Sequence, residues 1–478
     1  MATLFLIKTQ DVGDQVLGSF DRVLKLESIS DLIVRLYRDR LSNINSYEKS
    51  LSMVVYGNVP ARGTREITLD TLELEELREL LQQQFPCFNL TVTSPADAAD
   101  RAAEILSRQL GHDSRLSRML NWMYSENTNQ CSLKVYTMLE HLSEVRHPLQ
   151  KPYSSLIAKE IDLRSLLELP EHNSEQHYWN QLSTWDFSAL SLTTSELIWV
   201  SFLILDRLST EAHIRISSSD LFLLLLNLEA SYHQGNKFHN FRHAVDVMQA
   251  TWQLCCCLSS YIKSSQDVLL LCIAAIGHDI GHPGTNNALL CEHHSPIAEI
   301  YGGCSVLENF HGEVFISLLQ THWPLVASSQ RLAISDAILA TDMALHSQYL
   351  DKLESAPVTC STLMSLIIKA ADISNVTRPL EISTQWAVLI TCEFDECTLL
   401  EKRLKEGDKF TGTSESDVNI PSTLNSILEK YPSIPKGQLF FINTFAQNLF
   451  AGLSDKFEEL KFLNENVQSN KKFWLGKC

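Results

Sequence analysis

The sequence lacks the features of several large classes of protein. It has no surplus of basic residues, since 57 Asp and Glu against 39 Lys and Arg give a formal charge of −18. A chain of this charge repels polyphosphate, so we expect no broad nucleic-acid-binding surface. Any anionic ligand must be small and must meet a local positive feature such as a metal. The 17 Gly and 14 Pro among 478 residues are too few for a collagenous or low-complexity chain.

Long hydrophobic runs are also absent. The longest, Ile198–Leu205 and Leu221–Leu226, stop far short of the roughly 18–20 residues that a membrane span needs. The N-terminus has no basic segment and too short an apolar run for a signal peptide. The 12 Cys contain no CxxC pair, and Cys255, Cys256 and Cys257 are consecutive, which favours buried reduced thiols over a disulfide framework. We therefore expect a soluble cytoplasmic protein, with an additional nuclear location left open.

Residues 1–130 alternate strand-like runs with helical ones, which predicts a small α/β domain. Three apolar runs bounded by turn formers are typical of strands: Thr3–Ile7, Leu51–Gly57 and Phe88–Ser94. Helical periodicity occurs at 31–40, 72–85 and 97–110. The region has no GxGxxG or GK[ST] phosphate loop, so we expect a regulatory or packing module.

The rest of the chain has a different character. Residues 131–177 are helical pieces punctuated by proline, which predicts a helical connector. From Tyr178 strand signals vanish, which predicts an all-helical domain over 178–478. The clearest helical patterns span Ser195–Leu208, Ser219–Tyr232, His243–Leu258, Gln266–Ile276, Ala333–Met343 and Cys360–Ala371. The polar stretch 402–436 is predicted to be a mobile loop beside a cleft.

The segment FHNFRHAVDV places His239 and His243 four residues apart. On one helix, the two imidazoles would share a face about one turn apart. A zinc peptidase would need Glu directly after the first His as its general base, and Asn240 stands there. Taken alone, two such histidines are more often a satisfied helix-face pair than a site.

Two further segments make a functional site the better interpretation of these histidines. In AAIGHDIGHPG, His278 and Asp279 follow an apolar run and His282 comes four residues after His278, while Asp372 ends the apolar run of IIKAADISN. Such groups at apolar helix ends are costly unless a cation satisfies them. Imidazoles and carboxylates suit zinc or a harder divalent ion. We predict that His243, His278, Asp279 and Asp372 hold a metal, in the H…HD…D order of HD-type phosphohydrolases.

The predicted cluster suits phosphodiester hydrolysis. Asp279 has a second oxygen that can bridge to a second ion, held otherwise mainly by water. Two ions about 3.5–4 Å apart can share a hydroxide, because binding lowers the pKa of water toward roughly 7. That hydroxide would attack phosphorus in line, and His239 is placed to give the leaving alkoxide its proton.

Five motifs resemble those of the class I cyclic nucleotide phosphodiesterases: HNxxHAxDV (239–247), HDxxHPG (278–284), SVLEN (305–309), TDM (341–343) and ADISN (371–375). The similarity covers roughly residues 178–465, and the whole chain also resembles the high-affinity cAMP phosphodiesterases of budding yeasts. The resemblance implies a mainly α protein, with an all-helical HD-type catalytic domain after the small α/β domain. It also implies hydrolysis of 3′,5′-cyclic AMP to 5′-AMP, which lowers cAMP signalling.

The same resemblance implies roles for individual residues. His239 corresponds to the proton donor, and the four predicted ligands correspond to a zinc site from which Asp279 bridges to magnesium or manganese. His282, Glu308 and Thr341 correspond to residues that orient metal-bound waters.

A second group of matching residues is implied to bind the base. Gln438 would hydrogen-bond its edge, since an amide offers a donor and an acceptor in one plane. Phe441 would stack on one face with Ile390 beneath the other, and Asn375 would contact the base. Four positions depart from the family pattern without touching the predicted metal ligands, and they bear on nucleotide selectivity and on sensitivity to inhibitors: Phe238, Phe310, Ser383 and Phe440.

Three alternatives stay open. An HD-type hydrolase acting on another nucleotide, such as a triphosphate, would want a basic cluster, and only Arg242 lies near the metal segments. A non-catalytic cyclic-nucleotide sensor would lack a ligand or the donor His, and all are present. Dual hydrolysis of cAMP and cGMP is the third, because selectivity rests on resemblance alone. We expect cAMP as the small-molecule partner and no nucleic acid.

Overall fold

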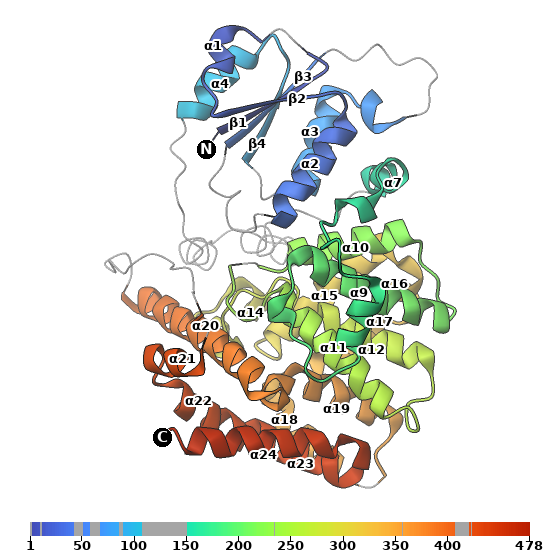
Figure 1. The fold of residues 1–478 in the computed structure, drawn as a ribbon, viewed down its shortest axis with the longest axis vertical. Helices are drawn as coiled ribbons and strands as arrows, with labels where there is room; N and C mark the ends of the chain where they lie inside the picture. Colours follow the sequence, from blue (N-terminus) through green and yellow to red (C-terminus); the bar gives the residue numbers. More distant parts are fainter. Residues whose placement is uncertain are drawn as a thin grey trace.

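The protein consists of a small sheet flanked by helices near the N-terminus and a larger helical part (Figure 1). This structure is a computed structural model. It describes residues 2–9, 12–42, 51–57, 67–85, 89–107, 151–233, 235–355, 357–406, 420–421 and 423–478.

The sheet has four parallel strands in the order β2-β1-β3-β4. The strands are β1 (Ala2–Ile7), β2 (Arg22–Leu26), β3 (Leu51–Tyr56) and β4 (Asn89–Thr93). Three of them confirm strands predicted from the sequence. The fourth, β2, was not predicted because Arg22 and Lys25 interrupt its apolar pattern. It lies at the sheet edge and most of its residues are only half-buried, so it needs no continuous apolar run.

Helices cover both faces of this sheet (Figure 1). Helices α1 (Asp14–Leu17) and α4 (Ala98–Ser107) pack on the side of Leu4 and Leu6. Helices α2 (Ile29–Ser42) and α3 (Leu74–Gln84), with the short η2 (Leu69–Thr71), pack on the side of Phe5 and Ile7. Burial on both faces explains why the strand TLFLI is apolar without alternation. The predicted small α/β domain is confirmed.

From residue 151 onward, the described chain contains helices and no strand. The α-helices are α7 (Lys151–Glu160), α8 (Glu175–Leu182), α9 (Thr194–Glu211), α10 (Ser218–Ser231), α11 (Phe241–Cys257), α12 (Ser265–Gly277), α13 (Asn287–Glu292), α14 (Pro296–Ile300), α15 (Val306–His322), α16 (Pro324–Ser329), α17 (Arg331–Leu339), α18 (His346–Glu354), α19 (Cys360–Asp372), α20 (Leu380–Glu406), α21 (Leu424–Lys430), α22 (Ile434–Phe441), α23 (Gln447–Lys456) and α24 (Lys461–Leu475). Short 3₁₀ or π turns lie at η3 (Leu163–Leu166), η4 (Ala189–Ser191), η5 (Met343–Leu345), η6 (Ser374–Thr377), η8 (Ile442–Ala446) and η9 (Glu458–Leu460). The predicted all-helical fold is confirmed, and no helix in the described ranges is long and apolar enough to cross a membrane.

Helix α12 lies at the centre of the helical part and positions the candidate site. Every residue from Leu269 to Gly277 is buried, and the helix packs against α9, α11, α17 and α19. A helix that is apolar on all sides is stable only inside a core. Its buried C-terminus therefore delivers the next residues, His278 and Asp279, to the interior of the protein.

Two sequence expectations need correction. The predicted loop 402–436 is too broad: α20 continues to Glu406, and α21 occupies Leu424–Lys430, because the Thr423 side chain caps the helix and Ile427 is buried. Residues 407–419 of this stretch lie outside the described residues. The helix predicted to reach Met343 ends at Leu339 instead.

The domain limits stay predictions. The expected limit at residue 130 lies outside the described residues, and the limit at 177/178 falls inside α8. The core on the α2 and α3 side of the sheet is continuous with that of the helical part.

Candidate metal centre

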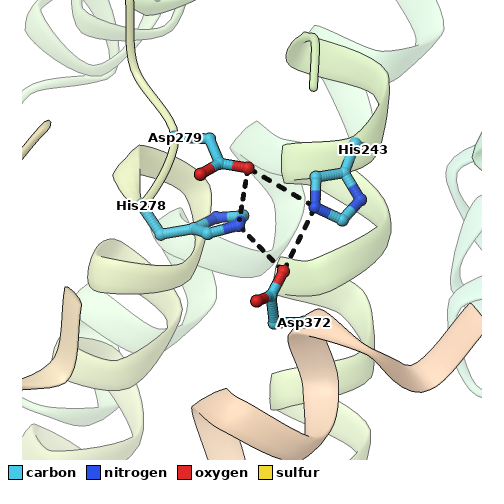
Figure 2. A group of neighbouring side chains, drawn as sticks. All are labelled: His243, His278, Asp279 and Asp372. Carbon is cyan, nitrogen blue, oxygen red and sulfur yellow. Dashed lines mark hydrogen bonds and ion pairs between the residues drawn. The ribbon is translucent and has the colours of Figure 1, made fainter. Parts of the chain in front are cut away.

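The four predicted ligands come together from three helix ends (Figure 2). His243 lies in the first turn of α11, His278 and Asp279 follow α12, and Asp372 is the last residue of α19. One ligand atom from each lies within 4.8 Å of the others. His278 Nε2 is 3.1 Å from Asp279 Oδ2 and 3.2 Å from Asp372 Oδ1. His243 Nε2 is 3.3 Å from Asp372 Oδ1 and 3.6 Å from Asp279 Oδ2.

Local sequence explains how α12 ends at this point. A Cβ on Gly277 would lie 2.4 Å from the Phe315 ring, so glycine lets α15 approach the end of α12 closely. Gly281 and Gly284 then adopt φ angles of 71° and 74°, a conformation that favours glycine. These turns fold the HDIGHPG segment back on itself.

His239 differs from its predicted position, because it precedes α11 and does not lie on it. Asn240 caps the helix: its side chain accepts hydrogen bonds from the backbone N–H groups of Arg242 and His243. A residue before an N-cap leaves the helical path. The two imidazoles nevertheless stay close, with ring centroids 5.8 Å apart.

Glu393 on α20 holds His239, and sequence analysis missed this residue. Its carboxylate contacts His239 Nδ1 and accepts hydrogen bonds from the backbone N–H groups of Phe238 (2.7 Å) and His239 (3.1 Å). Burial lowers the pKa of His239, but the Glu393 carboxylate outweighs burial and raises it to about 9. With Nδ1 held by Glu393, Nε2 is the ring nitrogen left to act on a ligand.

Of the three residues expected to orient waters, His282 and Thr341 are buried and Glu308 is half-buried. The His282 ring stacks on that of His239 at 4.0 Å, and a Thr341 Oγ1–H donates to the carbonyl of Ile338. Glu308 accepts a hydrogen bond from Asn287 Nδ2 at 3.0 Å, and burial raises its pKa to about 7.

His311 belongs to the same neighbourhood, although sequence analysis gave it no role. Together with Asp279 and His282 it forms a second group of potential ligand atoms within 4.8 Å of one another. Its Nδ1 is 2.7 Å from the Ile280 carbonyl oxygen, and its Nε2 lies 3.8 Å from Asp279 Oδ1. The available signal in the sequence was the position of His311 two residues after the SVLEN motif (305–309).

Comparison with known proteins identifies the family. Residues 238–467 match the family described as 3′5′-cyclic nucleotide phosphodiesterase. The chain is 42% identical to 3′,5′-cyclic-nucleotide phosphodiesterase 2 of Saccharomyces cerevisiae, over 99% of each protein. This chain belongs to the 3′,5′-cyclic nucleotide phosphodiesterase family. The resemblance that the motifs indicated is therefore confirmed.

Other members of the family are more distant in sequence but similar in fold. This phosphodiesterase is 27% identical to the human high affinity cAMP-specific and IBMX-insensitive 3′,5′-cyclic phosphodiesterase 8A, over 61% of this chain and 38% of the human protein. The crystal structure of yeast caPDE2 aligns with all of this chain and all of its own, with a TM-score of 0.78 and 26% identity. The fold similarity thus includes the N-terminal sheet.

Phosphodiesterases of this family are metal-dependent hydrolases, and the four clustered residues fit a divalent cation. His278 Nδ1 lies 2.8 Å from the Ala275 carbonyl oxygen, so Nδ1–H donates there and the Nε2 lone pair faces the cluster. Burial lowers the pKa of His278, but the carboxylates of Asp279 and Asp372 outweigh burial and raise it well above its usual value. The two carboxylates thus attract positive charge to this point, and in place of that proton a divalent cation can bind Nε2 together with both carboxylates.

The four residues expected to bind the base lie on neighbouring elements. Asn375 is on η6, Ile390 on α20, and Gln438 and Phe441 on α22, and α20 packs against both η6 and α22. Ile390 is three residues before Glu393, so the two share a side of α20. Within the described part, the buried Gln438 Oε1 has no hydrogen-bond partner. Phe441 packs its ring 5.5 Å from that of Phe445.

Proposed function

We propose that this phosphodiesterase hydrolyses 3′,5′-cyclic AMP to 5′-AMP. The observation that carries the proposal is the cluster of His243, His278, Asp279 and Asp372 beside the His239–Glu393 pair. The four-residue cluster suits a Zn²⁺ ion. Asp279 would also hold a second ion, Mg²⁺ or Mn²⁺, whose other ligands would be mainly water, with His282 and His311 beside it.

The chain's own groups divide the reaction between them. When bound, the two cations would activate a water for attack on phosphorus and neutralise the phosphate oxygens. His239, protonated because Glu393 raises its pKa to about 9, would donate a proton to the leaving 3′-oxygen. Glu393 would keep the ring oriented and stabilise its positive charge. His282, Glu308 and Thr341 would orient waters around the site.

Selectivity for cAMP is supported by the amide of Gln438. Its buried Oε1 has no partner in the described part of the chain, and a buried acceptor favours a ligand that donates to it. Adenine carries an amino group at C6, whereas guanine carries a carbonyl oxygen there. Phe441 and Ile390 would sandwich the base, and Asn375 would contact it. The human relative, whose name specifies cAMP, agrees with this choice.

The proposal is tested with purified protein assayed on cAMP and cGMP, before and after treatment with a chelator. We expect activity to disappear with the metals and to return with Zn²⁺ plus Mg²⁺ or Mn²⁺. We also expect a higher kcat/KM for cAMP than for cGMP, and a lower ratio in Gln438→Ala. Full activity in the stripped protein would overturn the metal mechanism, and equal kcat/KM values would overturn the cAMP assignment. Hydrolysis of a nucleoside triphosphate in place of either would support the alternative HD-type hydrolase.

A further inference from the structure

Helix α10 ends at the segment that carries two of the four clustered residues. Tyr232 directly follows α10, and its hydroxyl donates to the Ile276 carbonyl at 2.8 Å. The same oxygen accepts a hydrogen bond from the backbone N–H of Asp279 at 3.3 Å. One residue earlier, the Ser231 carbonyl accepts from the N–H of Gly281 at 3.0 Å. The last residue of α10 and its C-cap, Ser231 and Tyr232, thus fix the backbone on both sides of His278 and Asp279.

The same helix is held by the N-terminal domain one turn upstream. Arg40, near the end of α2, pairs with Glu229 and donates to the Leu226 carbonyl at 2.8 Å. Arg40 and Glu229 are only 3% and 2% exposed. Gln84, the last residue of α3, donates to Asn227 Oδ1 at 3.4 Å. Helix α2 extends from the sheet toward the helical part of the protein (Figure 1).

Asn227 connects this contact to a second element of the site. Its Nδ2 lies 3.2 Å from Nε2 of His322, the last residue of α15. Helix α15 also carries Glu308 and His311. The buried polar contacts of α10 therefore run from the sheet domain to the segment 276–281 and to the end of α15, the helix that also carries Glu308 and His311.

We propose that the N-terminal domain positions the metal-holding segment through α10, and that the Tyr232 hydroxyl is the contact that acts on this segment. The inference rests on the proposed metal site. Tyr232 is a positioning residue: among the described residues its oxygen bonds only backbone groups of the segment 276–279, and the orientation of the Asp279 carboxylate depends on that backbone. Contacts that orient metal ligands typically change metal affinity by about 10–100-fold when removed.

The first test replaces Tyr232 by Phe, which keeps the ring and removes the hydroxyl. Zn²⁺ affinity is measured by competition with a chromophoric chelator on protein stripped of metal. We expect the Kd to rise at least about 10-fold, with a lower kcat and an unchanged KM for cAMP. Tyr178→Phe is the matched control. Tyr178 is equally buried, and its hydroxyl donates to Glu196 at 3.0 Å. Glu196 lies on α9 and not in the metal-holding segment. The Zn²⁺ Kd of Tyr178→Phe should equal that of the wild type.

The second test asks whether the domain contact acts through Tyr232. The paired change Arg40→Gln and Glu229→Gln removes both buried charges at once and leaves amides that can still bond. We expect the Zn²⁺ Kd to rise about 2- to 30-fold. In a Tyr232→Phe background the same pair should cause no further rise. A rise that simply multiplies with that of Tyr232→Phe would overturn the coupling.

The remaining outcomes separate this inference from the proposed function. If the wild-type protein binds no Zn²⁺, the proposed metal site fails. If the wild type binds Zn²⁺ and Tyr232→Phe binds it equally well, the positioning role alone is wrong. An equal loss of affinity in Tyr178→Phe would also overturn it, because the effect would then be general loosening of the helical part.

Discussion

Two of the regions in which this phosphodiesterase buries charged side chains are the candidate metal centre and the contact between α2 and α10. At the contact, Arg40 faces Glu229, so the charges balance within the chain. In the candidate metal centre, Asp279 and Asp372 face two histidines, side chains that carry no permanent charge. The comparison teaches that burial of polar groups does not by itself mark a site. A site is indicated where the buried charge lacks a permanent counter-charge of its own.

The largest expected effect comes from removing one of the two carboxylates. Asp372→Ala should lose bound metal and hydrolysis of cAMP together, because the cluster then keeps a single carboxylate. Metal content is measured by elemental analysis alongside turnover. Asp336→Ala, at an exposed position of α17, is the control and should keep both. Full zinc occupancy in Asp372→Ala would contradict the ligand assignment. The carboxylates of the cluster would then not differ from the balanced Arg40–Glu229 pair in needing a cation.

The next effect separates metal binding from proton transfer. His239→Ala should keep both metals and lower kcat by roughly 10²–10⁴, the usual contribution of a general acid. His239 contacts Glu393 and is not one of the four clustered residues, so its loss leaves the ligand set intact. Metal content and kcat are measured on the same preparation. Unchanged turnover would exclude His239 from the mechanism.

A third effect concerns stability at the domain contact. Arg40→Met alone leaves the buried Glu229 carboxylate without its partner, which should cost about 3–5 kcal/mol in the free energy of unfolding. Replacing Glu229 by Leu as well should recover most of this loss, because a paired apolar replacement of a buried ion pair is often neutral. Urea unfolding measures both. If the double variant were no more stable than Arg40→Met, charge balance would not explain this contact.

The two regions also differ in how far sequence predicts them. The cluster was predictable because His278, Asp279 and Asp372 follow or end apolar helical runs, a pattern that local sequence displays, and the H…HD…D order adds His243. Glu393 was not, since its partner His239 is 154 residues away and nothing around Glu393 distinguishes it from a solvent-exposed acid on a helix. The pair of Arg40 and Glu229 is 189 residues apart and is hidden for the same reason. Asn240 was a usable signal: an N-cap residue there already places His239 before the helix.

The smallest expected effect is a pH dependence of stability caused by His322, which contacts Asn227 on α10 and lies outside the four clustered residues. Burial lowers the pKa of His322 to about 4, and Asp220 offsets this only in part. The hydrogen bond with Asn227 also favours the neutral imidazole. Asn227 Nδ2, 3.2 Å from His322 Nε2, is a donor, and a protonated Nε2 would be a second donor facing it. In the unfolded chain the imidazole takes up its proton near pH 6.5.

Between pH 6.5 and 4 the unfolded state therefore binds more protons than the folded state, so stability falls as the pH falls through this window. A shift from 6.5 to about 4 corresponds to at most about 3 kcal/mol. In His322→Gln, whose amide oxygen can still accept from Asn227, this part of the acid sensitivity should be absent. Urea unfolding at pH 7 and pH 5 measures the difference, with His172→Gln at an exposed position as control. If wild type and His322→Gln lost equal stability between these pH values, the acid-sensitive groups would lie elsewhere, and the polar contacts of α10 would contribute no pH dependence of their own.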